Sequence, residues 1–178
     1  MTLKLILVGC GNMGFAMLAG WLERGLDPKR ILVQDPSPPP AIAELLKSHG
    51  IAHHATLPKR DQPPAVLLMA VKPQIMDDVF PGLAKLAGPK TVVLSIAAGK
   101  TIASFEKHLP KGAAVVRSIP NTPAAVGRGI TVAAANAHVT PAHRQVCDAL
   151  LAAIGEVAWV DDEALIDPVT AVSGSGPA

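Results

Sequence analysis

The amino-acid sequence predicts an α/β fold with a doubly wound, mostly parallel β-sheet. Apolar runs at 5–8 and 65–71 contain no polar residue, which is typical of strands buried on both faces of a sheet. Longer segments with helical spacing separate such runs, and this alternation indicates consecutive β-α-β units. A glycine-rich turn follows the first run directly, which marks a tight connection between a strand and a helix.

The individual elements follow from apolar periodicity and from the residues that begin and end helices. The first helix is predicted over 12–24, and Gly25 ends it. Pro73 and Pro141 open later helices, since proline fits the first helical turn. In order, we predict strands at 5–8, 31–33, 65–71, 91–96, 113–118, 130–134 and 157–160, and helices at 12–24, 41–48, 73 onward, 101–108 and 141–154.

The composition excludes several classes of protein. Hydrophobic residues make up 49% of the 178 residues and charged residues only 17%, so the chain is not intrinsically disordered. Aromatic residues make up 3% and the net charge is +2, which argues against a nucleic-acid partner. No apolar run reaches the roughly 20 residues of a membrane span. The start of the chain makes a poor signal peptide, and Cys10 and Cys147 give no disulfide framework, so we expect a cytoplasmic protein.

The glycine-rich turn has the spacing G-x-G-x-x-G, between a predicted strand and a predicted helix. Gly9 permits the tight turn, Gly11 lets the backbone approach a pyrophosphate, and Gly14 allows close packing of helix on strand. Asn12 and Met13 open the helix, whose free N–H groups and positive dipole end favour phosphate. The pattern therefore predicts a dinucleotide site. The alternative is a strand–helix turn without a ligand.

An acidic residue is expected about 20 residues further on, where it can hold the adenosine ribose. Asp35 follows the second strand at this distance from Gly14. A carboxylate accepts hydrogen bonds from ribose hydroxyls and repels a 2′-phosphate, and no Lys or Arg follows before Lys47. The cofactor is therefore NADPH or NADH, with a preference for NADH. Asp35 could instead be a turn residue facing solvent, and Ser37 could still donate to a phosphate.

Two further strand ends supply candidate cofactor contacts, because ligands of open α/β sheets bind beyond the carboxyl ends of strands. Ala70, Lys72 and Pro73 follow the third strand, where the Lys72 ammonium could reach the ribose or the nicotinamide. The alternative for Lys72 is an exposed residue at a strand end. Ala97 and Ala98 follow the next strand and leave room for a flat ring.

Three further features of the sequence are considered as parts of a functional site: the segment 117–123, a pair of histidines and Cys10. Segment 117–123, RSIPNTP, is either a rigid loop beside the substrate or simple turn chemistry, and the residues alone do not separate these. His53 and His54 lie in a strand or loop without Cys or carboxylate partners at ligand spacing, so we expect no metal site. Cys10 is expected to be a packing residue rather than a nucleophile.

The end of the chain carries a family resemblance. Segment 167–178, DPVTAVSGSGPA, closely resembles the signature of pyrroline-5-carboxylate reductases. Four other segments match the same family in the same order: GCGNMG at 9–14, AVKPQ at 70–74, SIAAG at 95–99 and RSIPNTP at 117–123. The resemblance covers essentially the whole chain.

The resemblance implies that a nicotinamide cofactor gives hydride to the C=N carbon of 1-pyrroline-5-carboxylate, which yields L-proline in the last step of proline biosynthesis. It implies a Rossmann-type NAD(P)-binding domain over 1–162, then the beginning of a helical domain over 163–178 that forms homodimers or higher homo-oligomers. Lys72, Ala97 and Ala98 would lie by the nicotinamide. The residues implied on the substrate side are Asn121, Thr122, Ser173, Gly174, Ser175 and Gly176.

Chains of this family continue well beyond the signature at which this sequence stops. We therefore expect most of the helical domain to be missing and the chain alone to bind a dinucleotide with little or no turnover. No residue is assigned as the general acid. Two alternatives stay open: a non-catalytic dinucleotide-binding module, and a related reductase of another imine or of a β-hydroxyacid.

Overall fold

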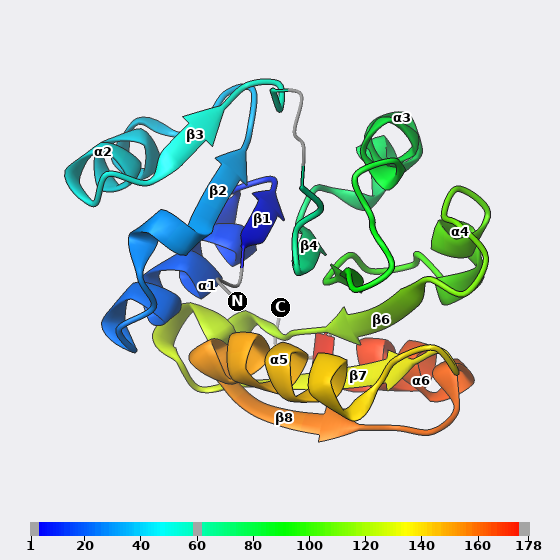
Figure 1. Ribbon diagram of the computed structural model, residues 1–178. Coiled ribbons are helices and arrows are strands. Elements are labelled where there is room, and N and C mark those ends of the chain that lie inside the picture. Colours follow the sequence, from blue (N-terminus) through cyan, green and yellow to red (C-terminus); the bar gives the residue numbers. More distant parts are fainter. Residues whose placement is uncertain (1–3, 59–61, 175–178) are drawn as a thin grey trace.

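The computed structural model describes residues 4–58 and 62–174. Within these ranges, eight strands form one sheet in the order β3-β2-β1-β4-β5-β6-β7-β8 (Figure 1). The strands are β1 (Leu5–Val8), β2 (Ile31–Gln34), β3 (Ala52–His54), β4 (Val66–Met69), β5 (Val92–Ser95), β6 (Ala114–Ile119), β7 (Gly129–Ala135) and β8 (Gly155–Trp159). The α-helices are α1 (Asn12–Glu23), α2 (Pro40–Ser48), α3 (Pro73–Ala84), α4 (Ile102–Glu106), α5 (Pro141–Leu151) and α6 (Ile166–Val169).

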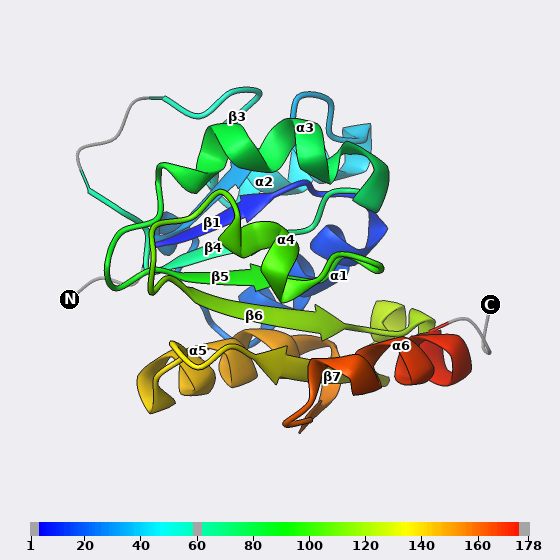
Figure 2. The ribbon, with the colours of Figure 1, turned by 90° about the vertical axis from the view of Figure 1, so that its right-hand side faces the viewer.

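The direction of the strands divides the sheet into two parts. Strands β1 to β6 are mutually parallel, whereas β7 is antiparallel to β6 and β8 is parallel to β7. The arrowheads of β6 and β7 accordingly point in opposite directions in Figure 2. The predicted doubly wound, mostly parallel sheet is confirmed. The strand direction changes once, between β6 and β7.

Helices cover both faces of the sheet, because successive strand residues point to opposite sides. Leu5 and Leu7 of β1 pack on one face in a cluster with α1, α2 and α5. Ile6 and Val8 pack on the other face with α3 and α4. A third cluster joins Ile166 of α6 to β6 and β7. All four residues of β1, β4 and β5 are buried, as the continuous apolar runs predicted.

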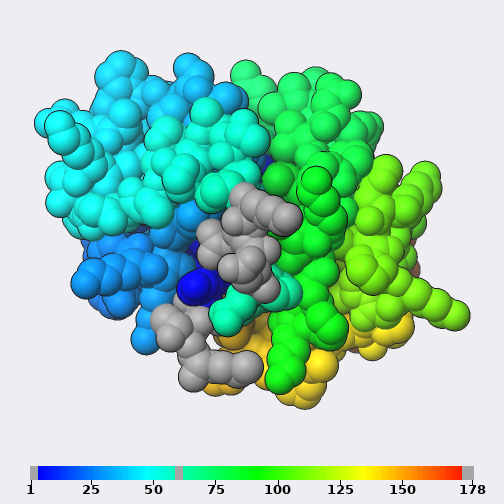
Figure 3. Space-filling view, turned by 45° about the horizontal axis from the view of Figure 1, so that its top comes forward, coloured from blue at the N-terminus to red at the C-terminus, as the bar shows by residue number. Residues whose placement is uncertain are grey.

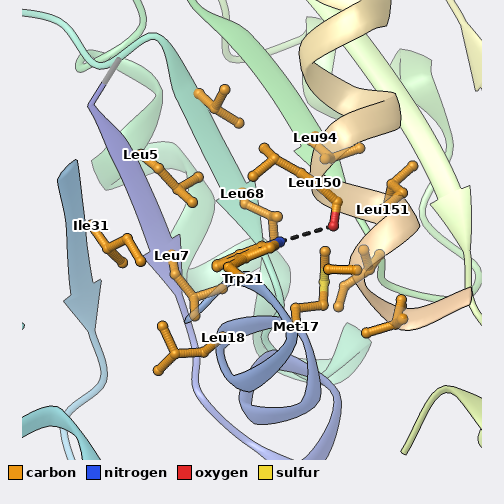
Figure 4. Packing of buried hydrophobic residues seen from close by; sticks show 14 of the residues in the cluster. Leu5, Leu7, Met17, Leu18, Trp21, Ile31, Leu68, Leu94, Leu150 and Leu151 are labelled. Carbon is orange, nitrogen blue, oxygen red and sulfur yellow. Dashed lines mark hydrogen bonds between the residues drawn. The ribbon is translucent and has the colours of Figure 1, made fainter. Parts of the chain in front are cut away.

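Trp21 anchors the contact between α1 and α5. Its side chain is 2% exposed, and its Nε1–H donates a 2.9 Å hydrogen bond to the carbonyl oxygen of Leu150 (Figure 4). Met17 and Leu18 lie on the same buried face of α1. The indole thus fills space between sheet and helices and also satisfies a polar group near the end of α5.

The predicted elements agree with the structure except near their ends. The helix predicted over 141–154 ends at Leu151, and a 3-10 turn, Ala152–Ile154, completes the segment. Thr101 caps α4 by accepting the N–H of Ser104 at 3.2 Å. The short strand β3 pairs with β2 at the sheet edge, where two of its three residues are exposed, so no apolar run marks it in the sequence. In the described ranges, no helix is long and apolar enough to span a membrane.

Candidate functional site

The candidate cofactor residues lie along one edge of the sheet. The register pairs Val8 with both Gln34 and Met69, and Ser95 with both Met69 and Arg117. The turns that follow β1, β2, β4 and β5 therefore leave the sheet at the same level, and β6 continues two residues further at this edge. This carboxyl edge lies on the right in Figure 2, together with α6. The strand order reverses between β1 and β4, which is where open α/β sheets bind their ligands.

The turn after β1 requires glycine at two positions for reasons within the protein. Gly9 has φ +86°, a left-handed conformation that residues with a side chain rarely adopt. A Cβ atom on Gly14 would lie 2.6 Å from the carbonyl oxygen of Gly9 and 3.5 Å from the Cβ of Ala70. Helix α1 therefore begins directly against the turn and close to the end of β4.

Gly11 has no such reason within the described residues. Its φ of −71° is open to any residue, and apart from its two chain neighbours no residue has an atom within 4 Å of where its Cβ would be. Gly11 is the N-cap of α1 and has no side chain to accept the first N–H groups of the helix. The turn thus leaves an open cradle beside free N–H donors at the positive end of a helix, which fits a pyrophosphate.

Asp35 extends toward this turn. Its Oδ2 accepts the N–H of Cys10 at 2.8 Å, and its Oδ1 accepts the N–H of Ser37 at 2.9 Å. His53 on β3 contacts the carbonyl oxygen of Asp35 through Nε2 at 2.8 Å. The half-buried carboxylate is therefore fixed beside the glycine turn, whereas Ser37 is exposed. The sequence showed the position of Asp35, but not its hydrogen bond to a residue 25 positions earlier.

Cys10 is a packing residue in this turn. Its side chain is fully buried, and burial, followed by the nearby charge of Asp35, raises the pKa of the thiol from 9.0 to about 12. The thiol is therefore neutral at pH 7 and is no nucleophile. Cys147 is also buried and free, and burial raises its pKa to about 12 as well.

The turns after β4 and β5 lie at the same edge of the sheet, and the candidate cofactor residues in them differ in exposure. Lys72 is exposed as the N-cap of α3, Ala70 and Pro73 are half-buried, and Ala98 is half-buried. Ala97 is 4% exposed and packs in the core, so Ala98 is the more accessible of the two alanines. Ser95 holds this turn, because its Oγ accepts the N–H of Ala97 at 3.2 Å.

The structure brings two of the predicted substrate-side residues together. Asn121 donates from Nδ2 to the Oγ of Ser173 at 3.1 Å, and its Oδ1 accepts the N–H of Ile130 at 2.9 Å. Thr122 is exposed at the start of a 3-10 turn, Thr122–Val126. Gly174 ends a single π-helical turn, Thr170–Gly174, that continues α6. Ser175 and Gly176 lie outside the described residues.

One charged cluster was missed at the sequence level. Arg117 on β6 is 3% exposed and forms ion pairs with Glu163 at 3.1 Å and with Asp167 at 2.5 Å. The available signal was a single charged residue that directly follows the apolar residues 113–116 within the strand predicted at 113–118. The partners lie 46 and 50 positions later, so the sequence does not reveal the pairing.

Across residues 4–58 and 62–174, no three His, Cys, Asp or Glu side chains are arranged to hold a metal ion. A shallow cavity of about 360 Å³ lies beside Lys111 and His138, near the amino end of β6. It is at the opposite edge of the sheet from the glycine turn. Figure 3 shows another part of the molecular surface, the one around β3 and α3.

A doubly wound sheet with a glycine turn against a helix, and an acidic side chain after the second strand, defines the class of dinucleotide-binding domains. The comparison with known families agrees. A family model described as "NADP oxidoreductase coenzyme F420-dependent" matches residues 4–99, more than half of the chain. The chain belongs to this family.

Individual relatives are similar to the chain over nearly its whole length, and they confirm the resemblance to pyrroline-5-carboxylate reductases. The chain is 37% identical over 177 residues to a pyrroline-5-carboxylate reductase of Pseudomonas aeruginosa, a match that covers 99% of this chain and 64% of that protein. It is also 37% identical over 179 residues to the Escherichia coli enzyme of the same name, covering 100% of this chain and 66% of the relative. The solved structure of a pyrroline-5-carboxylate reductase from Coxiella burnetii matches with a TM-score of 0.90 at 31% identity, over 99% of this chain and 66% of that one. The chain thus spans about two thirds of the length of these proteins.

Proposed function

We propose that this chain is the dinucleotide-binding part of a pyrroline-5-carboxylate reductase. In this reaction NAD(P)H and a proton reduce the C=N bond of 1-pyrroline-5-carboxylate to give NAD(P)⁺ and L-proline. The observation that carries the proposal is the 37% identity to enzymes of this name over nearly the whole chain. The open cradle at Gly11 supports it independently, because the protein itself does not require a glycine there. The free thiols of Cys10 and Cys147 suit a cytoplasmic enzyme.

The bound cofactor would supply the hydride, and the residues of this chain would hold the cofactor and the substrate in position. The N–H groups at the start of α1 would hold the pyrophosphate, with Gly11 leaving the space for it. Ala97 and Ala98 would leave room for the nicotinamide ring beyond β5. Asn121 and Ser173 would line the substrate side. Hydride transfer to an imine that is already protonated depends on such positioning more than on a strong acid or base.

We also propose that residues 163–178 begin a second, helical domain through which the whole protein forms a homodimer. Three features of the described part of this segment support the division. Its helix α6 packs through Ile166 on β6 and β7 as a separate small cluster. Its contacts to the sheet also include the charged pairs of Arg117. Val172 is 77% exposed, an apolar side chain that a further domain could cover.

The fixed carboxylate of Asp35 leads us to propose that NADH binds more tightly than NADPH. Asp35→Ser is expected to raise the affinity for NADPH relative to NADH by about tenfold, because removing one charge near a 2′-phosphate changes the energy by about 1.4 kcal/mol. Both affinities fall somewhat, since the hydrogen bond to Cys10 is lost. The dissociation constants of both cofactors, measured by titration calorimetry at fixed salt, check the ratio.

Asp27→Ser is the matched control for Asp35. Asp27 is an exposed aspartate before β2 rather than after it, and it caps a short turn. Its replacement should leave the ratio unchanged. A native chain that prefers NADPH, or an unchanged ratio in Asp35→Ser, would remove the basis of the NADH preference.

The activity itself is tested by supplying the part of the relatives that this chain does not match. Residues 1–178 are fused to the part of the Pseudomonas aeruginosa relative that follows its matched region. We expect the fusion to oxidise NADH or NADPH in the presence of 1-pyrroline-5-carboxylate and to form L-proline, whereas residues 1–178 alone bind cofactor with little or no turnover.

A second fusion carrying Gly11→Val is the control, and we expect it to lose turnover. A folded fusion that binds cofactor but forms no proline would favour the alternative of a non-catalytic dinucleotide-binding module. Reduction of a different imine, but not of 1-pyrroline-5-carboxylate, would point to a related imine reductase.

A further inference from the structure

The buried guanidinium of Arg117 joins two distant parts of the chain. Arg117 lies on the same face of β6 as Val115 and Ile119, because residues two apart point to the same side of a strand. Val115 packs in the cluster with α3 and α4, and Ile119 in the cluster with α6. Arg117 therefore stands between these clusters, at a place where an unpaired charge would be strongly destabilising.

Both ion-pair partners of Arg117 come from residues 163–174, which we call the terminal segment. Nη1 donates to Glu163 Oε1 at 3.1 Å, and Nη2 donates to Asp167 Oδ1 at 2.5 Å. The same Glu163 oxygen accepts the N–H of Ile102 at 2.8 Å, the first residue of α4. Glu163 and Asp167 are four residues apart, so the guanidinium contacts two successive turns and fixes both the position and the rotation of the segment.

The rest of the terminal segment has few anchors to the sheet. Ile166 is 1% exposed in the third cluster, and Ser173 accepts the hydrogen bond from Asn121. In contrast, Leu165 is 48% and Val172 is 77% exposed. Apolar burial through Ile166, with Val169 beside it, holds the segment on the sheet, but apolar contacts have no preferred direction and oppose a small rotation of the segment only weakly. The ion pairs of Arg117 are directional and oppose this rotation.

We propose that Arg117 is a positioning residue, which holds the terminal segment in one orientation and so places Ser173 against Asn121 at the carboxyl edge of the sheet. In the proposed enzyme, this would set the substrate side relative to the cofactor side before either ligand binds. The proposal rests on the proposed function only for the role of Ser173. The link between Arg117 and the terminal segment can be measured without turnover.

Hydrogen exchange of the native chain and of four variants, resolved by peptide, tests the link. Asp167→Asn removes an exposed partner, and we expect exchange over 164–173 to be about two- to fivefold faster, as exposed pairs contribute about 0.2–1 kcal/mol. Arg117→Met removes both ion pairs, and we expect exchange over 164–173 to be at least about tenfold faster than in the native chain. Arg117→Lys keeps a charge but only one donor group, so its exchange should lie between native and Arg117→Met. The matched control is Asp161→Asn, an exposed aspartate two residues before Glu163 that makes no ion pair with Arg117.

The distribution of the change distinguishes positioning from general stability. In Asp167→Asn, we expect hydrogen exchange in β1 and β4 to stay within twofold of native, and likewise the affinities for NADH and NADPH. Equal exchange in Asp167→Asn and Asp161→Asn would overturn the proposal, as would no difference between the Lys and Met variants. If Arg117→Met does not fold, the exchange of Asp167→Asn and Arg117→Lys relative to the native chain and to Asp161→Asn still tests the proposal. A native chain that binds neither NADH nor NADPH would contradict the proposed function but would leave the exchange result valid.

Discussion

Replacing Gly11 with valine is expected to weaken dinucleotide binding on the order of 100-fold. A side chain there would occupy the open cradle beside the N-terminus of α1 and displace the pyrophosphate from one or two N–H donors, at about 1.5–3 kcal/mol for each charge-assisted hydrogen bond. The fold should tolerate the change, because φ is −71° and, apart from the two chain neighbours, no residue has an atom within 4 Å of a Cβ at this position. Loss of the glycine N-cap costs about 1 kcal/mol. Calorimetric titration with NADH and NADPH measures the affinity, and thermal unfolding measures the stability.

Gly82→Val is the matched control for Gly11. Gly82 is an exposed glycine of α3, and a Cβ at this position would likewise meet no atom within 4 Å outside its own stretch of helix. Its replacement should leave both dissociation constants unchanged. If Gly11→Val binds either cofactor as tightly as the native chain, the pyrophosphate does not use this turn.

Replacing Trp21 with alanine is expected to lower the free energy of unfolding by about 3–5 kcal/mol, the range for truncating a large buried aromatic residue. The change opens a cavity between α1, α5 and the sheet and leaves the carbonyl of Leu150 without its donor. Trp21→Phe keeps most of the volume but loses the N–H, so it should cost about 1–3 kcal/mol. Urea unfolding followed by circular dichroism measures both values.

Trp159→Ala provides the comparison for Trp21. Trp159 is only half-buried on the edge strand β8, where its Nε1–H donates to Asp148 and Arg144 lies over its ring. We expect a clearly smaller loss of stability than for Trp21→Ala. Equal losses in the two variants would show that the contact between α1 and α5 is not the central one in this fold.

Much of the fold could be predicted because its signals are local. The all-apolar runs of β1, β4 and β5 reflect burial on both faces of a parallel sheet. Gly9 and Gly14 were recognisable because a left-handed turn and a helix packed against a strand both exclude a side chain. Edge strand β3 carried no comparable signal, since two of its three residues face solvent.

The candidate site shows the same division. The positions of Gly11, Asp35 and Lys72 follow from the rule that ligands meet the carboxyl ends of parallel strands. The partners of these residues do not follow from the sequence. The hydrogen bond from Cys10 to Asp35 depends on β1 and β2 lying side by side in register. The ion pairs of Arg117 depend on α6 and the 3-10 turn before it returning to the face of β6, and no local pattern specifies a contact between residues 46 or 50 positions apart.

The sequence by itself determined the α/β class, the glycine turn and the family of this protein, because periodicity and short motifs are properties of neighbouring residues. Only the tertiary structure decided which side chains meet at the carboxyl edge. It turned the carboxylate of Asp35 toward the glycine turn and placed Ser173 beside Asn121. It also buried Arg117 between two carboxylates of the terminal segment. These contacts depend on the distance and direction between elements, which strand order, register and packing fix together.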